Sequence, residues 1–149
     1  RRSLRTAAVD AAAPASPAPE GRGLLLIGAG WARTGTQSLV KALARLGLAA
    51  YHGRNAFHEG DMRLWCDWLT RGSARSLDLA LKGITDKGYN ATLDKPMCFL
   101  YKALLQRFPH AKVLLTVRDS AEEWYHSSRR FLNSMGGNDC EAEMHRMEG

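Results

Sequence analysis

The sequence predicts an α/β fold in which a parallel β-sheet carries helices on both faces. Two observations support this prediction. Short, fully apolar runs, typical of strands covered on both sides, alternate along the chain with segments of helical periodicity. Strands that alternate with helices are joined by crossover connections, which make them parallel. Ligands bind such sheets beyond the carboxyl ends of the strands, so we expect the functional residues in the turns that follow them.

The composition is that of one globular domain. The chain has 149 residues, of which 45% are hydrophobic and 24% charged, and its formal net charge is +6. This basic excess suits an anionic partner, but no Lys/Arg stripe with interleaved aromatic residues indicates nucleic acid. No apolar run has the roughly 20 residues of a membrane span. Because Cys66, Cys98 and Cys140 lack metal-ligand spacing, we expect no metal.

The domain is expected over residues 23–149. Residues 1–22 are rich in Ala, Pro, Ser and Arg and contain no aromatic residue, so they cannot bury enough apolar surface to fold. They fit a disordered linker or the remnant of an organellar targeting segment. We expect a cytoplasmic location for the protein, and the possible targeting segment makes an organellar location the alternative. The chain begins at Arg1 and stops at Gly149 without a terminal feature, and we expect it to be part of a longer protein.

The first strand–helix–strand unit directly follows this linker. The run LLLI at 24–27 predicts a buried strand, and LAAY at 48–51 predicts a second one. Between them, leucines spaced i, i+4 and i+7 predict a helix from about Thr36 to Leu46. Gly47 is expected to end this helix.

Two helical segments and a third strand occupy the middle of the chain. Apolar residues on one helical face predict a helix over residues 61–71, and LDLALKGI at 77–84 predicts a further turn or two. YNATL at 89–93 leads into the third strand. Pro96 then opens a helix at its first position, where the missing N–H does no harm.

The clearest strand is KVLLTV at 112–117. Ser120, followed three residues later by Glu123, forms a capping box that opens a helix ending near Leu132. The turns in which the chemistry is expected are therefore residues 28–36, 94–96 and 118–120.

The turn after the first strand is suited to hold an anion. Its glycines let the backbone approach a ligand with N–H groups pointing inward. The following helix N-terminus adds partial positive charge, and Arg33 adds a full charge on a planar fork. The glycines and hydroxyl residues of this turn are Gly28, Gly30, Gly35, Thr34, Thr36 and Ser38.

Two common phosphate-binding motifs fit this turn poorly. The nucleotide P-loop, GxxxxGK[ST], meets Thr36 where it needs lysine and Gln37 where it needs the hydroxyl that binds magnesium. The dinucleotide motif GxGxxG meets Arg33 at its third glycine. The second strand also leads into Tyr51 and His52, so no acid is present there to bind a ribose.

Two segments resemble the donor-binding signatures of the sulfotransferase family. WARTGTQSL at 31–39 is similar to the loop that binds a 5′-phosphosulfate, and KVLLTVRDSAEEWYHSS at 112–128 is similar to the strand and helix that bind a 3′-phosphate. The likeness covers about residues 24–132. It implies a P-loop NTPase-like three-layer sandwich that uses 3′-phosphoadenosine-5′-phosphosulfate (PAPS) as co-substrate. It also implies a small-molecule or glycan acceptor and a further C-terminal segment, without which the domain is partial.

The resemblance assigns donor-binding residues one by one. Arg118 matches the arginine that binds the 3′-phosphate. The family spacing places the accompanying serine at His126, so Ser127 is the nearest hydroxyl and Ser128 is the alternative. The residues implied for the phosphosulfate are Gly30, Arg33, Thr34, Gly35, Thr36, Gln37 and Ser38.

The catalytic residues implied by the resemblance are Arg33 and Asp94. Arg33 stabilises the charge that grows on the phosphate leaving group. The acceptor's proton needs a general base, and Asp94 stands two residues before Pro96, where small-molecule sulfotransferases have a histidine. An aspartate is a weak base unless its site is dry, and it also suits a helix cap. His52 and His58 are the alternatives.

Three functions follow as hypotheses. The first is a sulfotransferase that moves a sulfuryl group from PAPS to a hydroxyl or amine. The second is a nucleotide kinase or NTPase, against which the missing P-loop lysine counts. The third is a non-catalytic nucleotide-binding module, which the aspartate at position 94 keeps open. The sequence does not indicate an oligomeric state.

Overall fold

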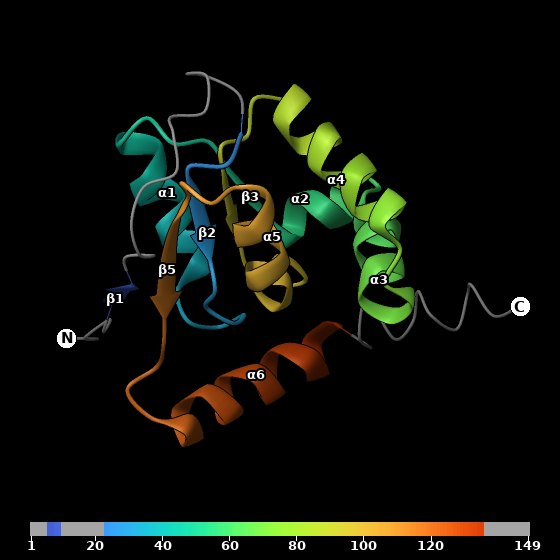
Figure 1. Ribbon diagram of the computed structural model, residues 1–149. Helices are drawn as coiled ribbons and strands as arrows, with labels where there is room; N and C mark the ends of the chain where they lie inside the picture. Colours follow the sequence, from blue (N-terminus) through green and yellow to red (C-terminus); the bar gives the residue numbers. More distant parts are fainter. Residues whose placement is uncertain (1–5, 10–22, 136–149) are drawn as a thin grey trace, which may run out of the picture.

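A five-stranded sheet with the order β1-β5-β2-β4-β3 forms the centre of the computed structural model, which describes residues 6–9 and 23–135 (Figure 1). Four neighbouring strands of this sheet are parallel, as predicted. Each of the four overlaps the apolar run from which it was predicted. They are β2 (Leu26–Gly28), β3 (Ala50–His52), β4 (Ala91–Leu93) and β5 (Lys112–Thr116).

The fifth strand, β1 (Thr6–Val9), was not predicted. It lies antiparallel to β5 at the edge of the sheet, with Val9 opposite Val113. A short Ala-rich stretch carries no strand signal of its own, and here the unpaired edge of β5 supplies the partner. The prediction of a linker or targeting remnant over residues 1–22 therefore needs correction at β1. Its remainder lies outside the described residues.

One face of the sheet is covered by α1 (Thr36–Arg45). Its buried Leu43 packs with Ala50, Ala91 and Leu93, whose side chains point to this face of their strands. The helix ends one residue earlier than predicted, and Leu46 is its C-cap and is exposed. Gly47 follows in the left-handed conformation at φ 79°, as its role in ending the helix requires.

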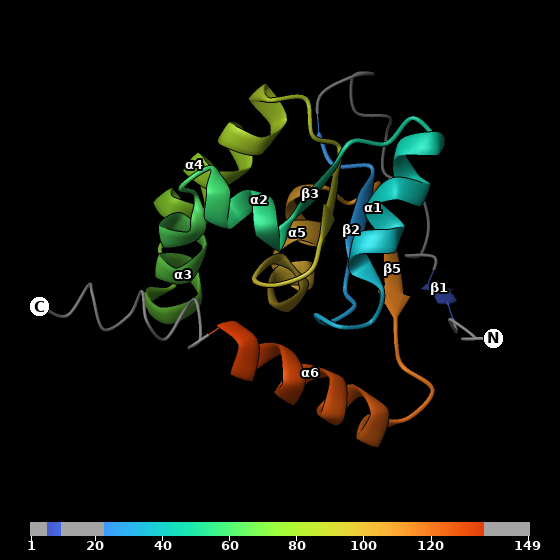
Figure 2. The same ribbon diagram turned by 180° about the vertical axis from the view of Figure 1, so that it is seen from behind.

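The opposite face carries the larger apolar core. Three helices cover it: α3 (Met62–Arg71), α4 (Ala74–Asp86) and α5 (Tyr101–Arg107). Ile27 and Tyr51 alternate with the residues that face α1, and they pack here against Trp65. Figure 2 shows α1 in front of the sheet and α5 behind it. The predicted layers, with helices on both faces of a sheet, are confirmed.

Several helices differ in extent from those predicted. α4 is longer than the turn or two expected, because Ser73 caps its N-terminus and accepts a hydrogen bond from the Ser76 amide at 3.3 Å. The short α2 (Gly53–His58) was not predicted. The helix after Pro96 begins as the 3₁₀ segment η1 (Met97–Leu100).

The strand order creates a crevice between the carboxyl ends of the neighbouring strands β2 and β4. From β2 the chain passes through α1 to β3, beyond β4, whereas from β4 it passes through α5 to β5 on the other side of β2. Connections that leave neighbouring parallel strands for opposite faces leave such a crevice open, and ligands bind there. Helix α6 (Ala121–Met135) lies across this end of the sheet (Figure 1). Within the described residues, no helix combines the length and apolar character needed to cross a membrane.

Candidate active site

Two cavities meet at the carboxyl ends of the strands. The first has a volume of about 680 Å³ and the second about 650 Å³. Arg33, Gly35 and Arg118 line both and so form the junction between them. Other predicted site residues are divided between the two: Thr36, Gln37, His52, His58 and Asp94 line the first cavity, and Thr34, Ser38 and Ser127 line the second.

Two residues at the first cavity have an unusual backbone conformation. Arg33 has φ 71° and Asp94 has φ 73°, the left-handed region that side-chain-bearing residues rarely adopt. Each such residue costs on the order of 1 kcal/mol and persists only where its surroundings fix it, commonly in functional sites. Arg33 follows β2 and Asp94 follows β4. The strain therefore marks the same two turns that the sequence indicated.

Arg33 and Arg118 converge on the hydroxyl of Ser127. Arg33 Nε donates to Ser127 Oγ at 3.2 Å, and Arg118 Nη2 donates to the same oxygen at 3.2 Å. Arg118 Nε also donates to the Arg33 carbonyl at 2.6 Å. Among the described residues, no carboxylate forms an ion pair with either guanidinium. Two positive charges gathered in this way suit a bound anion, which would relieve their repulsion.

The geometry favours Ser127 over its neighbours as the serine that accompanies Arg118. Ser127 is buried between the two arginines. His126, the position given by the family spacing, is exposed and lies 3.7 Å from Glu122. The Ser128 hydroxyl is buried without a hydrogen-bond partner and faces neither cavity.

Gly30 and the Thr34 side chain support the loop rather than face a ligand. A Cβ at Gly30 would collide with the Thr116 side chain and lie 2.8 Å from its carbonyl oxygen, so only glycine fits against β5. The Thr34 hydroxyl donates to the Trp31 carbonyl at 2.6 Å and lies 2.7 Å from the Thr116 hydroxyl. Trp124, on α6, donates to the Ala32 carbonyl at 2.9 Å and thereby ties α6 to the same loop.

The N-terminus of α1 presents unpaired amides to the junction. Gly35 adopts φ 91° and caps the helix, with no side-chain hydrogen bond to the cap. Within the described residues, the amides of Gly35, Thr36 and Gln37 have no acceptor, whereas the Ser38 amide donates to the Gly35 carbonyl at 3.0 Å. The first amides of a helix, together with its dipole, form an anion-binding site.

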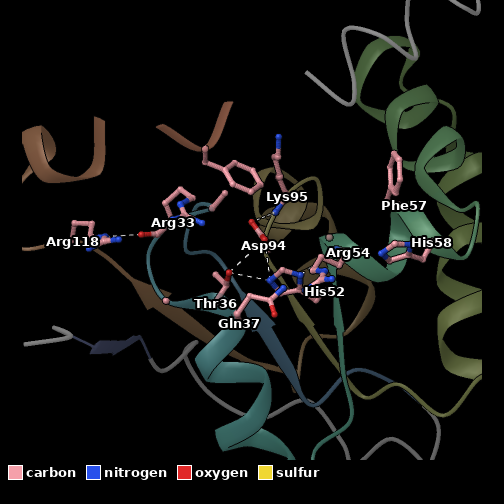
Figure 3. A pocket seen from close by; sticks show the side chains of 14 residues that line it. Arg33, Thr36, Gln37, His52, Arg54, Phe57, His58, Asp94, Lys95 and Arg118 are labelled. Carbon is pink, nitrogen blue, oxygen red and sulfur yellow. Dashed lines mark hydrogen bonds and ion pairs between the residues drawn. The ribbon is translucent and has the colours of Figure 1, made fainter. Parts of the chain in front are cut away.

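Thr36, His52 and Asp94 form a hydrogen-bonded cluster (Figure 3). His52 Nε2 lies 2.9 Å from Asp94 Oδ2 and 3.0 Å from the Thr36 hydroxyl. That hydroxyl lies 3.4 Å from the same carboxylate oxygen. His52 Nδ1 accepts a hydrogen bond from the Arg54 amide at 3.1 Å. The proton of the neutral imidazole is therefore assigned to Nε2, from which it points to Asp94.

This cluster bears on the choice of general base. Both nitrogens of His52 are engaged, one as an acceptor and one as a donor, so the ring has no lone pair free to take a proton from a substrate. The Asp94 carboxylate lines the first cavity and keeps 12% of its side chain exposed. His58 is exposed on the far side of Arg54 from Asp94 (Figure 3). The geometry thus favours Asp94 over both histidines.

Comparison with known proteins decides the family. A family model described as a sulfotransferase domain matches residues 25–148. The chain belongs to this family. It is also similar to the Ava biosynthesis cluster protein M of Aspergillus versicolor, with 39% identity over 111 residues. This match covers 69% of the chain and 41% of the relative, so the chain spans about two fifths of the length of that relative. The family resemblance drawn from the two sequence motifs is confirmed.

A polar network behind the first cavity fixes α2 of the sulfotransferase domain. The Asn55 side chain accepts from the His52 amide at 3.1 Å and donates to Glu59 at 3.0 Å. Glu59 also accepts from Lys87 at 2.7 Å and from Tyr89 at 2.9 Å. Burial acts to raise the pKa of Glu59, but the hydrogen bonds from Lys87, Tyr89 and Asn55 outweigh it and lower that pKa.

A buried thiol lies behind the turn that carries Asp94. The Cys98 amide donates to the Asp94 carbonyl at 2.8 Å. Burial, with the nearby negative charge of Asp94, raises the pKa of the Cys98 thiol to about 12. Cys98 therefore remains a protonated, unreactive thiol and supports the turn by packing.

Sequence reasoning missed several residues that line the first cavity of the sulfotransferase domain. Phe57 and Arg54 come from α2, which was not predicted. Phe131 lies on α6, with the Arg33 guanidinium 4.9 Å from its ring centre. Only tertiary packing brings these side chains to the cavity, so the sequence carried no signal for them.

Proposed function

We propose that this sulfotransferase domain binds PAPS across the junction of the two cavities and transfers its sulfuryl group to an acceptor in the first. The observation that carries the proposal is the convergence of Arg33 and Arg118 on Ser127, beside the free amides of α1. PAPS bears two anionic groups, a 3′-phosphate and a 5′-phosphosulfate. The second cavity suits the 3′-phosphate through Arg118 and Ser127. The start of α1, with Arg33, suits the phosphosulfate.

The transfer follows from this placement. The acceptor's hydroxyl or amine attacks the sulfur, and the bond from sulfur to the phosphate oxygen breaks. Asp94 takes the proton that the acceptor loses. The 5′-phosphate, now carrying the released negative charge, leaves as part of 3′-phosphoadenosine-5′-phosphate (PAP). Arg33 and the α1 amides stabilise that charge as it develops.

The first cavity favours a small-molecule acceptor with an apolar part. Its volume of about 680 Å³ is within the range of small-molecule sites. Phe57 is 58% exposed on one wall, and Phe131 contributes a second ring. Arg54 and His58, which lie with Phe57 on α2, add polar groups to the same cavity. The name of the similar Aspergillus versicolor protein refers to a biosynthesis cluster, which agrees with a small-molecule acceptor.

Calorimetric titration with PAP, compared with ADP plus Mg²⁺, tests the donor site. We expect PAP to bind more tightly, without a need for metal. Arg118→Ala should reduce the affinity for PAP by about tenfold or more and leave that for ADP unchanged, because a charged hydrogen bond contributes roughly 1.5–3 kcal/mol. Arg107→Ala is the matched control, since Arg107 pairs with Asp78 and lines neither cavity.

A different outcome would redirect the assignment. Preference for ADP that depends on Mg²⁺ would contradict the PAPS proposal and favour a kinase or NTPase. Tight binding of PAP without release of product from PAPS would favour a non-catalytic module.

A further inference from the structure

His52 occupies a position that a helix cap alone does not explain. It is 4% exposed, and each of its ring nitrogens has its own partner. Nδ1 accepts from the Arg54 amide and so caps α2. Nε2 points the other way, to the carboxylate that stands in the first cavity, at 2.9 Å. A cap needs only the first of these contacts.

We propose that His52 is the positioning residue for Asp94, with its Nε2–H held on the carboxylate by the Arg54 amide. The inference rests on the proposed function, because it takes Asp94 as the general base. The Arg54 amide can donate only to an unprotonated Nδ1, so the proton of the neutral ring resides on Nε2. His52 thus supplies a fixed donor and never takes the acceptor's proton itself.

The contacts fix both carboxylate oxygens of Asp94. Oδ1 accepts from the Lys95 amide at 2.8 Å. Oδ2 receives the His52 Nε2–H, with the Thr36 hydroxyl at 3.4 Å. Asp94 has a backbone in the left-handed region, so its side chain leaves the chain in a direction that an ordinary turn does not provide. Donors on two sides hold the carboxylate in place, and Asp94 lines the first cavity.

Thr36 connects this pair to the donor loop. Its hydroxyl contacts His52 and Asp94, and its backbone amide belongs to the free first turn of α1. Thr36 therefore contacts the base, Asp94, through its side chain and contributes its backbone amide to the turn that we propose to hold the phosphosulfate. This fixes the distance between the group that takes the proton and the group that holds the leaving phosphate, and such alignment governs transfer rates.

Two substitutions separate capping from positioning. In His52→Asn the side-chain oxygen is near the place of Nδ1, so it can accept from the Arg54 amide but cannot reach Asp94. In His52→Gln the longer side chain can place an N–H near the position of Nε2, toward Asp94. If His52 acts through Asp94, the first should lose turnover and the second should recover most of it.

Turnover is measured on the full-length protein as the release of PAP from PAPS, with water as the acceptor. We expect His52→Asn to lower kcat about 10- to 100-fold, with the affinity for PAP and the melting temperature nearly retained. His52→Asn combined with Asp94→Asn should be no slower than Asp94→Asn alone, because both changes remove one function. His110→Asn, at an exposed histidine outside both cavities, is the control. Equal losses in the Asn and Gln variants, or losses that multiply in the double variant, would overturn the proposal.

Nitrogen-15 NMR of the imidazole provides a readout independent of turnover. We expect His52 to show an unprotonated Nδ1 and a protonated Nε2, and Asp94→Asn to shift the Nε2 resonance. A proton on Nδ1, or an Nε2 resonance that ignores Asp94→Asn, would overturn the positioning role even in an active enzyme. Failure of the protein to bind PAP would instead refute the proposed function. The NMR spectrum would still test the contact between His52 and Asp94.

Discussion

The Ser127 hydroxyl accepts hydrogen bonds from two arginines, and these occupy both of its lone pairs. The hydroxyl proton of Ser127 then remains available to donate a hydrogen bond to a ligand. Ser127 and Arg118 both line the second cavity, where the proposed function places the 3′-phosphate. Ser127 therefore orients the two arginines and, in the proposed function, adds a hydrogen bond to the anion they attract.

Replacing Ser127 by Ala should weaken PAP binding about tenfold, because one hydrogen bond to a charged group is lost and the two arginines lose their common acceptor. The affinity for ADP, which lacks the 3′-phosphate, should stay the same. Ser128→Ala is the matched control, since its buried hydroxyl has no partner and its removal should be neutral. Calorimetric titration of PAP and ADP into the unchanged protein and the two variants measures these affinities. Equal effects of the two substitutions would contradict the assignment.

At the level of single residues, sequence was informative where chemistry is local. Arg118 could be identified as a candidate because it directly follows the predicted strand at 112–117, and Arg33 because it lies in a glycine-rich turn that matches a family motif. Asp94 could be identified because it stands two residues before Pro96. The part played by His52 could not be predicted. It depends on a backbone amide of Arg54 and on a carboxylate from another strand, and neither contact leaves a pattern along the chain.

Among the structural elements, the loop between β2 and α1 depends on its closeness to β5. Gly30 lies against the backbone of Thr116, and Trp124 of α6 holds the next turn of the loop. The proposed phosphate cradle therefore requires β5 and α6 as well as its own residues. Any change that separates β2 from β5 should disturb the cradle.

Gly30→Ala should destabilise the fold by about 1–3 kcal/mol, since the added methyl group collides with Thr116 and the backbone must move. Gly83→Ala is the matched control. Gly83 lies inside α4 with nothing near its would-be Cβ, so there alanine should stabilise by about 0.5–1 kcal/mol. Urea unfolding measures both. Equal stability of the two variants would contradict the close packing at Gly30.

The elements that sequence missed are those with a weak local signal. α2 begins with Gly53 and is six residues long, too short for a helical period to show. The ends of α4, residues 74–76 and 85–86, lie beyond the segment predicted at 77–84, and the Ser73 cap with packing of the buried face extends the helix there. β1 exists through its pairing with β5 alone. Tertiary contacts, absent from the sequence pattern, decided all three.

At the scale of the whole molecule, one ionic network joins elements distant in sequence. Lys87, at the end of α4, pairs with Glu59 and Asp61 next to α2, and Tyr89 donates to the same Glu59. Burial and the hydrogen bond to Glu59 raise the pKa of Tyr89, so its hydroxyl stays a donor. The network holds α2, and with it Phe57 and Arg54, against the rest of the fold.

The pKa of Glu59 is lowered below its ordinary value of 4.5, so its contribution to stability is present above that value and is lost as the pH falls through the folded-state pKa. Glu59→Gln should therefore be less stable than the unchanged protein at pH 7, and the difference should shrink below about pH 4. Asp119→Asn, at an exposed carboxylate in the turn before α6, is the control. Chemical unfolding at several pH values tests this. A difference that stays constant with pH would contradict it.

The overall architecture could be predicted because alternating strands and helices leave few arrangements. The apolar runs predicted the parallel strands and the helices that cover them. They also predicted which turns carry the candidate functional residues. The division of the site into two cavities could not be predicted, since it depends on how α6 and α2 close the end of the sheet. The sequence thus indicated the turns after the strands as the candidate site, and the structure shows the cavities that these turns line.

The shared wall of Arg33 and Arg118 has a consequence for the order in which substrates bind. Before the donor arrives, the two guanidinium groups repel each other, and in the part of the chain that the structure describes both contact the neutral Ser127 hydroxyl. In the proposed reaction, the donor's phosphates neutralise this wall and hold it still. An acceptor that enters first meets an unfinished surface, whereas one that follows the donor meets a complete pocket. The kinetic sequence is therefore expected to be ordered, with the nucleotide first on and last off.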